Sequence, residues 1–183
     1  SVKRQSIPFE ALLQAGRDDI LLQTEIPLRT LSSTPIGAGF SWSRTLIHKR
    51  LPDQPDPIEG LTACLSESGF QLQETCAMAS SERLDRFVYR TYEDGELSVF
   101  ICVQTGFSIW ILINGYAADQ FFIKALMAAE AERTKVLGDG GGTGDILIAA
   151  TQTQQSENIE QRLNQLIKKG TAECIKEAAE LFE

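Results

Sequence analysis

The sequence contains little histidine, no closely paired cysteines and no long apolar run. His48 is the only histidine among 183 residues, which excludes a metal centre built from several histidines. Cys64, Cys76, Cys102 and Cys174 form no Cys-x-x-Cys pair, and their wide spacing does not fit a zinc site. No run is long enough to span a bilayer, and no signal peptide is recognised before Pro8. We therefore expect free thiols, a cytoplasmic location and no bound metal.

Basic residues are also fewer than acidic residues. The chain has 17 Lys and Arg against 25 Asp and Glu, a formal net charge of -8. Nucleic acids and anionic membrane surfaces are themselves negative, so we expect neither as a partner. Hydrophobic residues make up 43% and charged residues 23%, as in ordinary soluble globular domains. A chain of this length can bury a core of its own, and we predict a single domain over residues 1–183.

Periodicity and turn signals predict strands and helices in mixed order. Strand-like apolar runs lie at 19–25, 28–33, 41–51, 72–78, 84–92, 97–104, 109–114 and 145–150. Pro27 is expected to end the first of them, and Asp94-Gly95 predicts a hairpin. Helices are expected at 8–15, 58–68, 117–137 and 159–182. This combination predicts an α/β mixed (α+β) fold, with three to four helices packed on a mixed sheet.

A glycine-rich stretch links the third predicted helix to the last predicted strand. Five of the seven residues from Gly138 to Gly144 are glycine. Phosphate-binding glycine loops run from strand to helix, whereas this stretch runs from helix to strand. It is therefore either a helix cap with a flexible link or a ligand-facing turn ending in Thr143 and Asp145. In the second case its backbone N–H groups could stabilise an oxyanion.

Three separated stretches carry patterns that occur together in one family. The stretch from Leu31 to Gly39 resembles a Leu-Ser-Ser-Ala-Pro-x-x-Gly-Gly block. Ile113-Asn114 and the helix carrying Arg133-Thr134 resemble Ile-Asn and Glu-Ala-Lys-Thr-x-x-Leu segments, and 142–149 resembles a Gly-Thr-x-Thr-Asp strand start. Together they resemble the adenosylcobinamide amidohydrolase family. The resemblance implies hydrolysis of the amide that joins aminopropanol to the corrin ring. The product would be adenosylcobyric acid, made in corrinoid salvage for cobalamin biosynthesis.

Amide hydrolysis needs an activated water or nucleophile, an oxyanion stabiliser and a proton donor for the leaving amine. Asp145, Thr143 and His48 are our catalytic candidates. The candidate substrate-binding residues are Ser32, Ser33, Gly37, Gly39, Thr105, Gly106, Asn114, Gly142 and Gly144. A corrinoid would be substrate or ligand, and no separate cofactor is expected.

Each candidate also has a structural interpretation. The serines and threonines, Asp145 and Asn114 could cap turns. His48 could lie at the surface or be satisfied in the core. The flat faces of Trp42 and Trp110 could stack on a macrocycle, or both could pack in the core. Cys102, inside an apolar run, is expected to be structural.

The chain departs from the family pattern in three places. Thr105-Gly106 runs almost directly into the next strand, where the family has a longer Asn-containing loop. The helix glutamate is displaced to Glu130 or Glu132, and Leu46-Ile47-His48 replaces Ile-Leu-Asn. These departures motivate an alternative, a non-catalytic protein that binds a corrinoid or another small molecule on the same fold. A third hypothesis is a homo-oligomeric scaffold with the final helix as its interface.

Overall fold

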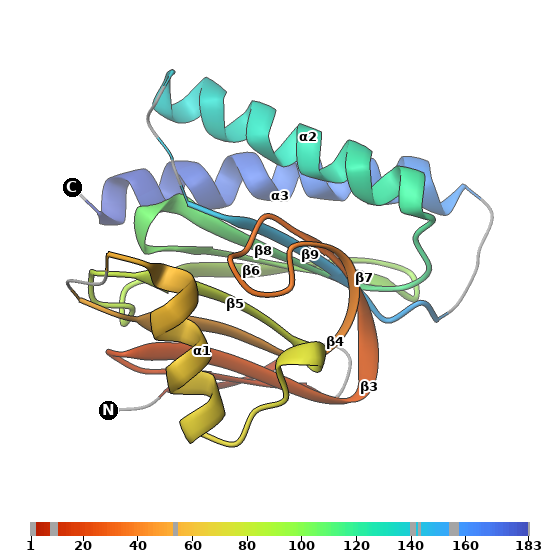
Figure 1. The fold of residues 1–183 in the computed structure, drawn as a ribbon. Coiled ribbons are helices and arrows are strands. Elements are labelled where there is room, and N and C mark those ends of the chain that lie inside the picture. Colours follow the sequence, from red (N-terminus) through yellow and green to blue (C-terminus); the bar gives the residue numbers. More distant parts are fainter. Residues whose placement is uncertain are drawn as a thin grey trace. The chain divides into compact units, whose positions relative to one another are not determined.

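The computed structural model describes residues 3–7, 11–52, 55–139, 142, 144–153 and 158–182. It divides into two compact units, Ser1–Asp85 and Arg86–Glu183, which we call unit 1 and unit 2 (Figure 1). Each unit has a mixed sheet with helical segments, and this confirms the predicted α+β class. That the whole chain forms one domain stays a prediction.

In its described residues, unit 1 has a sheet of five strands and one α-helix. Its elements are β1 (Lys3–Ile7), β2 (Ala11–Ala15), β3 (Asp19–Ser32), β4 (Gly39–Arg50), α1 (Pro57–Glu67), the 3-10 turn η1 (Leu72–Glu74) and β5 (Thr75–Ser80). Strands β1 to β4 pair antiparallel in chain order, and β5 then pairs parallel to β4. The helix supplies the crossover that a parallel pair needs.

Local chemistry sets where α1 begins and which side it buries. The Asp56 carboxylate accepts hydrogen bonds from the N–H groups of Ile58 and Glu59 at 3.0 and 3.5 Å, and Pro57 follows as the first helical residue. Leu61 and Leu65 are buried and belong to a cluster with Ile47 of β4 and Ala77 of β5. The helix therefore packs on the β4–β5 part of its sheet.

The described part of unit 2 contains four strands and two long helices. Its elements are β6 (Val88–Asp94), β7 (Leu97–Gln104), the 3-10 turn η2 (Thr105–Phe107), β8 (Ser108–Asn114), α2 (Asp119–Leu137), β9 (Ile146–Ala150) and α3 (Ile159–Leu181). Strands β6, β7 and β8 form an antiparallel meander, and β9 then pairs parallel to β8. The two helices lie side by side on one face of this sheet (Figure 1).

Helix α3 is fixed by an apolar stripe and by ion pairs at the edge of its contact. Its buried residues are Leu163, Ile167, Gly170, Thr171, Cys174, Ile175 and Ala178. Arg90 of β6 pairs with Glu177 at 2.8 Å, and Asp94 pairs with Arg162 at 2.7 Å. The apolar stripe of the final helix therefore packs within unit 2, and a homo-oligomeric scaffold with this helix as its interface stays a prediction.

The strongly periodic elements are confirmed. Helices lie at 57–67, 119–137 and 159–181, within two residues of the predicted bounds. The predicted hairpin joins β6 to β7, with Gly95 and Glu96 between the paired residues Asp94 and Leu97. Gly95 has a φ of 65°, a conformation in which glycine is favoured because it has no Cβ.

Two local predictions are wrong. Of the helix expected at 8–15, the described part is strand β2, and it pairs with β3. Leu13 and Ala15 are buried while Gln14 between them is less so, which is the alternation of a strand. Pro27 does not end a strand either, because β3 continues through it with a register shift between Gln23 and Leu28. Proline lacks the N–H that a ladder needs and is tolerated at such irregularities.

We predict that Gly170→Ala destabilises the protein. Helix propensity alone would favour alanine by about 1 kcal/mol. A Cβ at this position would, however, lie 2.5 Å from Ile101 Cδ1 and 2.6 Å from Tyr92 Cε2. Overpacking of this kind costs about 1–3 kcal/mol, so the urea midpoint should fall. Lys169→Ala, at the exposed neighbouring position, is the control, and an unchanged or higher midpoint for Gly170→Ala would contradict the packing.

Candidate functional site

In unit 2 the end of the glycine-rich stretch packs directly against the turn between β7 and β8. A Cβ on Gly144 would lie 2.5 Å from the backbone nitrogen of Ser108 and 2.7 Å from the carbonyl oxygen of Gly106. Both neighbours are backbone atoms, so only glycine permits this approach. The carbonyl of the next residue, Asp145, accepts a hydrogen bond from the N–H of Ile109 at 2.9 Å. We call the place where 142, 144–145 and 105–108 meet the glycine corner.

Arg133 of α2 fixes the glycine corner from inside. Its side chain is 7% exposed, and Nη1 donates to the carbonyls of Phe107 and Gly144 at 2.9 and 2.7 Å. Nη2 pairs with the carboxylate of Glu130. A Cβ on Gly142 would lie 2.8 Å from Arg133 Cδ. One guanidinium therefore joins both backbone segments of the corner to the helix that connects β8 with β9.

The third nitrogen of the Arg133 guanidinium differs from the other two in its hydrogen bonding. Arg133 Nε is buried and has no hydrogen-bond partner among the residues that the structure describes. Buried N–H groups are normally satisfied by protein or water. In the sequence, Arg133 belongs only to the family resemblance, and no pattern assigns it to the site. The contacts that make it central are to backbone carbonyls distant in sequence, which no local pattern reveals.

The β7–β8 turn has a constrained backbone. Gly106 has a φ of 78° and Phe107 a φ of 60°, and a left-handed conformation is uncommon for a phenylalanine. The Phe107 ring meets the ring of Phe182 edge-on, with 5.4 Å between centroids. Strand β8 begins immediately afterwards at Ser108. The longer loop of the family pattern therefore has no counterpart here, as the sequence indicated.

Asn114 does not belong to the glycine corner. Strand β8 runs from Ser108 to Asn114, and β9 is parallel to it, so Asn114 and Asp145 lie at opposite ends of the pair. Asn114 Oδ1 accepts hydrogen bonds from the hydroxyls of Thr151 and Thr153 at 3.1 and 3.3 Å. These contacts join the end of β8 to the residues that follow β9.

Four of the candidates, Ser32, Ser33, Gly37 and Gly39, belong to unit 1. Ser32 Oγ lies 2.8 Å from Thr34 Oγ1 and donates to the carbonyl of Gly37 at 3.1 Å. Gly37 has a φ of 81°, and a Cβ there would lie 2.6 Å from the carbonyl oxygen of Thr75 and 2.9 Å from Cys76 Sγ. Ser32 and Gly37 thus form one tight, hydroxyl-lined turn against β5. Ser33 and Gly39 are exposed.

His48 lies far along the strand pair from that turn. It is opposite Ile20, whereas Ser32 is opposite Gly39 at the other end of β3 and β4. Its exposure is 1%, so the surface alternative for His48 is wrong and it is a core residue. Thr143, the remaining catalytic candidate, lies outside the described residues. Of the catalytic set, the structure therefore places Asp145 at the glycine corner and His48 in unit 1.

Only one of the two tryptophans presents an accessible ring. Trp110 is fully buried in β8, whereas Trp42 of β4 is 50% exposed. The guanidinium of Arg29 lies 5.6 Å from the Trp42 ring centroid and 4.8 Å from that of Phe40. Unit 1 thus carries an exposed aromatic pair with the Arg29 guanidinium over it.

The described residues contain no group of three or more His, Cys, Asp or Glu that could hold a metal ion. None of the helices in the described ranges is long and apolar enough to cross a membrane. Comparison with known families gives no match, because no protein-family model matches the chain. The family resemblance therefore stays a prediction.

We predict that Arg133→Met opens the glycine corner. The substitution removes both N–H donors from the carbonyls of Phe107 and Gly144, and unsatisfied buried acceptors cost about 1–3 kcal/mol each. The free energy of unfolding should fall by about 2 kcal/mol or more. Lys135→Met, on the exposed side of the same helix, is the matched control. Equal stability of the two variants, measured by urea denaturation, would show that Arg133 does not hold the corner.

We also predict that the native thiols react very unequally. Burial raises the pKa of Cys102 to about 12 and that of Cys174 to about 11, so both stay protonated at pH 8, where only the thiolate is reactive. Cys76 is buried as well, which leaves Cys64 as the accessible thiol. Labelling with a chromogenic disulfide should show one fast thiol in the native state and four in guanidinium chloride. Two or more fast native thiols would contradict this burial.

Proposed function

We propose that the protein hydrolyses the amide that joins aminopropanol to the corrin ring of adenosylcobinamide and releases adenosylcobyric acid. The observation that carries the proposal is the glycine corner. Two stretches of the family resemblance that lie apart in sequence meet there, namely the helix segment with Arg133 and the segment with Gly142 and Gly144, beside the turn at 105–106 where the chain departs from the family pattern. Their contacts are direct, with Gly144 against Gly106 and Ser108 and with Arg133 bonded to Gly144.

The corner can supply two of the functions that amide hydrolysis requires. Asp145, which is partly exposed, can accept a proton from the attacking water. Backbone N–H groups of the glycine-rich turn can stabilise the oxyanion that forms when water adds to the carbonyl. As the C–N bond breaks, the acyl carbon keeps the hydroxyl and the amine nitrogen takes a proton. The products are a carboxylate and a protonated amine.

Incubation of the purified protein with adenosylcobinamide tests the proposal. Adenosylcobyric acid and aminopropanol should appear in equal amounts. Asp145→Asn should lower turnover by about 100-fold or more, as expected for loss of a general base. Asp139→Asn removes an exposed carboxylate six residues away in the chain and should leave turnover unchanged. No product at high protein concentration, or full activity of Asp145→Asn, would rule out this mechanism.

A second candidate function is corrinoid binding without catalysis. The short turn at 105–107 favours it, since the family pattern has a longer loop at this place. The exposed Trp42 ring offers a stacking surface for a macrocycle. Titration with adenosylcobinamide would then change the corrinoid spectrum without forming product, and Trp42→Ala should weaken that change. Absence of any spectral change would remove both functions.

A further inference from the structure

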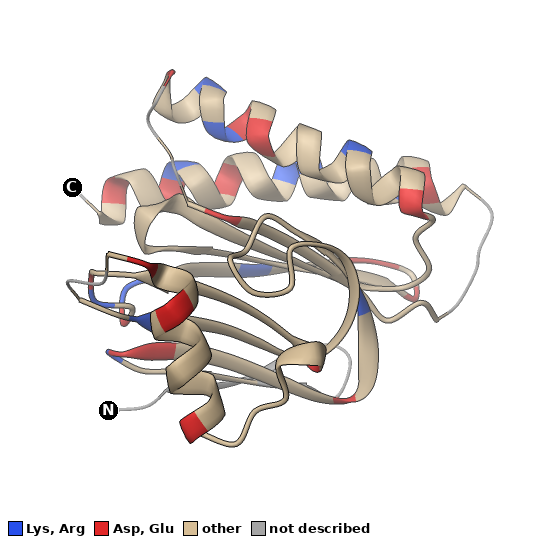
Figure 2. Cartoon of the chain, in the orientation of Figure 1, with Lys and Arg blue, Asp and Glu red and all other residues tan. Residues whose placement is uncertain are grey.

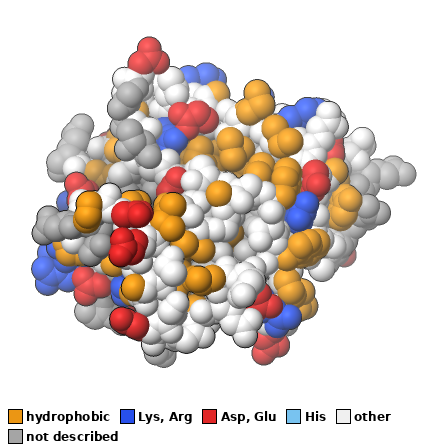
Figure 3. Space-filling view, viewed as in Figure 1, with side chains coloured by type: hydrophobic (Ala, Val, Ile, Leu, Met, Phe, Trp, Pro, Cys, Tyr) orange, Lys and Arg blue, Asp and Glu red, His pale blue; other side chains and the backbone are white. Residues whose placement is uncertain are grey.

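Helix α2 exposes an apolar line on the side opposite its buried face. Its buried residues are Phe121, Phe122, Ala125, Ala129 and Arg133. Ile123 and Met127 are 48% and 64% exposed, and Ala131 is exposed one turn further on. At about 100° per residue, Ile123 and Ala131 lie about 40° on either side of Met127. Hydrophobic side chains on this surface of the molecule are visible in Figure 3.

Charges of opposite sign border this apolar line. Asp119 and Glu130 lie on one flank, about 60–80° from Met127, and Lys124 and Lys135 lie at similar angles on the other. Within each flank, the second charged residue follows the first by eleven residues, which is about three helical turns. Figure 2 shows acidic and basic residues interspersed along α2. Lys124 makes no ion pair with any residue that the structure describes, and Lys135 pairs with Glu132 of its own helix at 3.2 Å.

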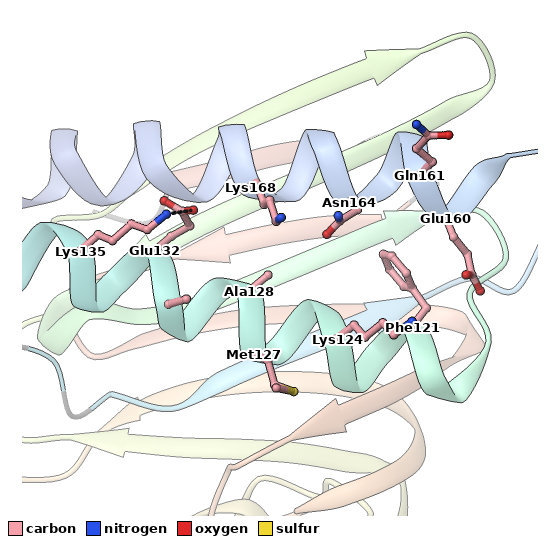
Figure 4. Close-up of a pocket in the computed structure, with 11 residues that line it drawn as sticks. Phe121, Lys124, Met127, Ala128, Glu132, Lys135, Glu160, Gln161, Asn164 and Lys168 are labelled. Carbon is pink, nitrogen blue, oxygen red and sulfur yellow. Dashed lines mark hydrogen bonds and ion pairs between the residues drawn. The ribbon is translucent and has the colours of Figure 1, made fainter.

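The basic flank borders an open groove between α2 and α3. The groove has a volume of about 660 Å³ and is also lined by Asn164, Lys168 and Glu160 of α3. Figure 4 shows Lys124, Lys135 and Lys168 along this groove, with Met127 at its border. Three lysines therefore line the groove together with two carboxylates, Glu132 and Glu160, although the protein as a whole is acidic.

We propose that α2 is the interface of a homodimer, in which the α2 helices of two copies pair in parallel around a two-fold axis that runs along them. In a parallel helix pair, flanking residues five positions apart face each other across the interface. Asp119 of one copy would then face Lys124 of the second copy, and Glu130 would face Lys135. The two-fold axis repeats both pairs on the other side of the interface, while the Met127 side chains meet at the centre.

The charge pattern selects this orientation. In an antiparallel pair each flank meets the same flank of the other helix, so lysines would face lysines and carboxylates would face carboxylates. Like charges placed opposite each other are destabilising. In the parallel pair every flanking contact joins opposite charges. The α2 surface, with an acidic flank on one side of the apolar line and a basic flank on the other, is therefore complementary to itself only when the two helices run parallel.

The surface favours a second copy of this chain as its occupant because one helix presents both complementary halves. Methionine at the centre adapts its shape to an identical neighbour. A single helix pair lies at the low end of protein interface sizes, for which association is weak or transient. We therefore expect a concentration-dependent dimer. The inference does not depend on the proposed function, because its tests change Met127, Asp119 and Lys124, which lie outside the glycine corner. Glu130, which pairs with Arg133 of its own helix, is left unchanged in these tests.

Sedimentation velocity over a range of protein concentrations tests the interface. The wild type should shift from monomer to dimer as concentration rises. Met127→Glu buries two carboxylates against each other and should give a monomer throughout. Ile58→Glu is the matched control, because Ile58 is a similarly exposed apolar residue on α1, 52% exposed, and should dimerise like the wild type. A wild type that stays monomeric, or dimerisation of Met127→Glu, would overturn the proposal.

A charge-swap experiment tests the parallel register. Lys124→Glu and Asp119→Lys should each weaken self-association by at least about tenfold, because like charges would face each other twice in each homodimer. A mixture of the two variants should associate again, since one native and one reversed pair then form. Circular dichroism of each variant confirms that the helix is intact. Failure of the mixture to associate would rule out contact between positions 119 and 124.

Discussion

The contact of Gly144 with the backbone of Gly106 and Ser108 is the constraint on which the arrangement of unit 2 depends. It fixes where the chain enters β9, and the parallel ladder with β8 starts at Ile146, two residues later. No side chain fits between these backbone segments, so the missing Cβ at position 144 is a requirement of the geometry. The Arg133 guanidinium then satisfies carbonyls from both sides of the contact. Helix, turn and strand are thereby held by one close approach.

The two ends of the β8–β9 pair serve different purposes in this arrangement. At one end, the backbone carbonyls of Phe107 and Gly144 accept hydrogen bonds from the buried Arg133 guanidinium, and the partly exposed Asp145 follows directly in the chain. At the other end, the Asn114 amide and the hydroxyls of Thr151 and Thr153 satisfy one another and close the strand exits. The proposed chemistry therefore lies at the glycine corner, whereas the polar residues at the Asn114 end have a structural role. Similar polar residues in the sequence thus have different roles because β8 separates them.

Sequence reasoning succeeded where a pattern extends over several turns or is set by a local rule. The long helices have enough periods to be recognised, and Asp94-Gly95 marks its hairpin by backbone preference alone. It failed at 11–15, the described part of the helix expected at 8–15, where five residues are too few to distinguish the two periods and pairing with β3 decides the outcome. The importance of Arg133 was not accessible either, because its acceptors are backbone carbonyls that carry no sequence signal. Glycine enrichment indicated the corner, but only the fold identifies Ser108 and Gly106 as its neighbours.

The order of strands in unit 2 has a consequence for how the protein folds. The β6–β7–β8 meander needs only short connections and can close quickly, since little chain entropy is lost in each step. Strand β9 can join only after the nineteen residues of α2 have crossed the sheet. The glycine corner is then completed last, after the meander that it packs against already exists. Synthesis from the N-terminus gives the same order, so a nascent chain carries a finished meander before the residues that would act on a substrate have emerged.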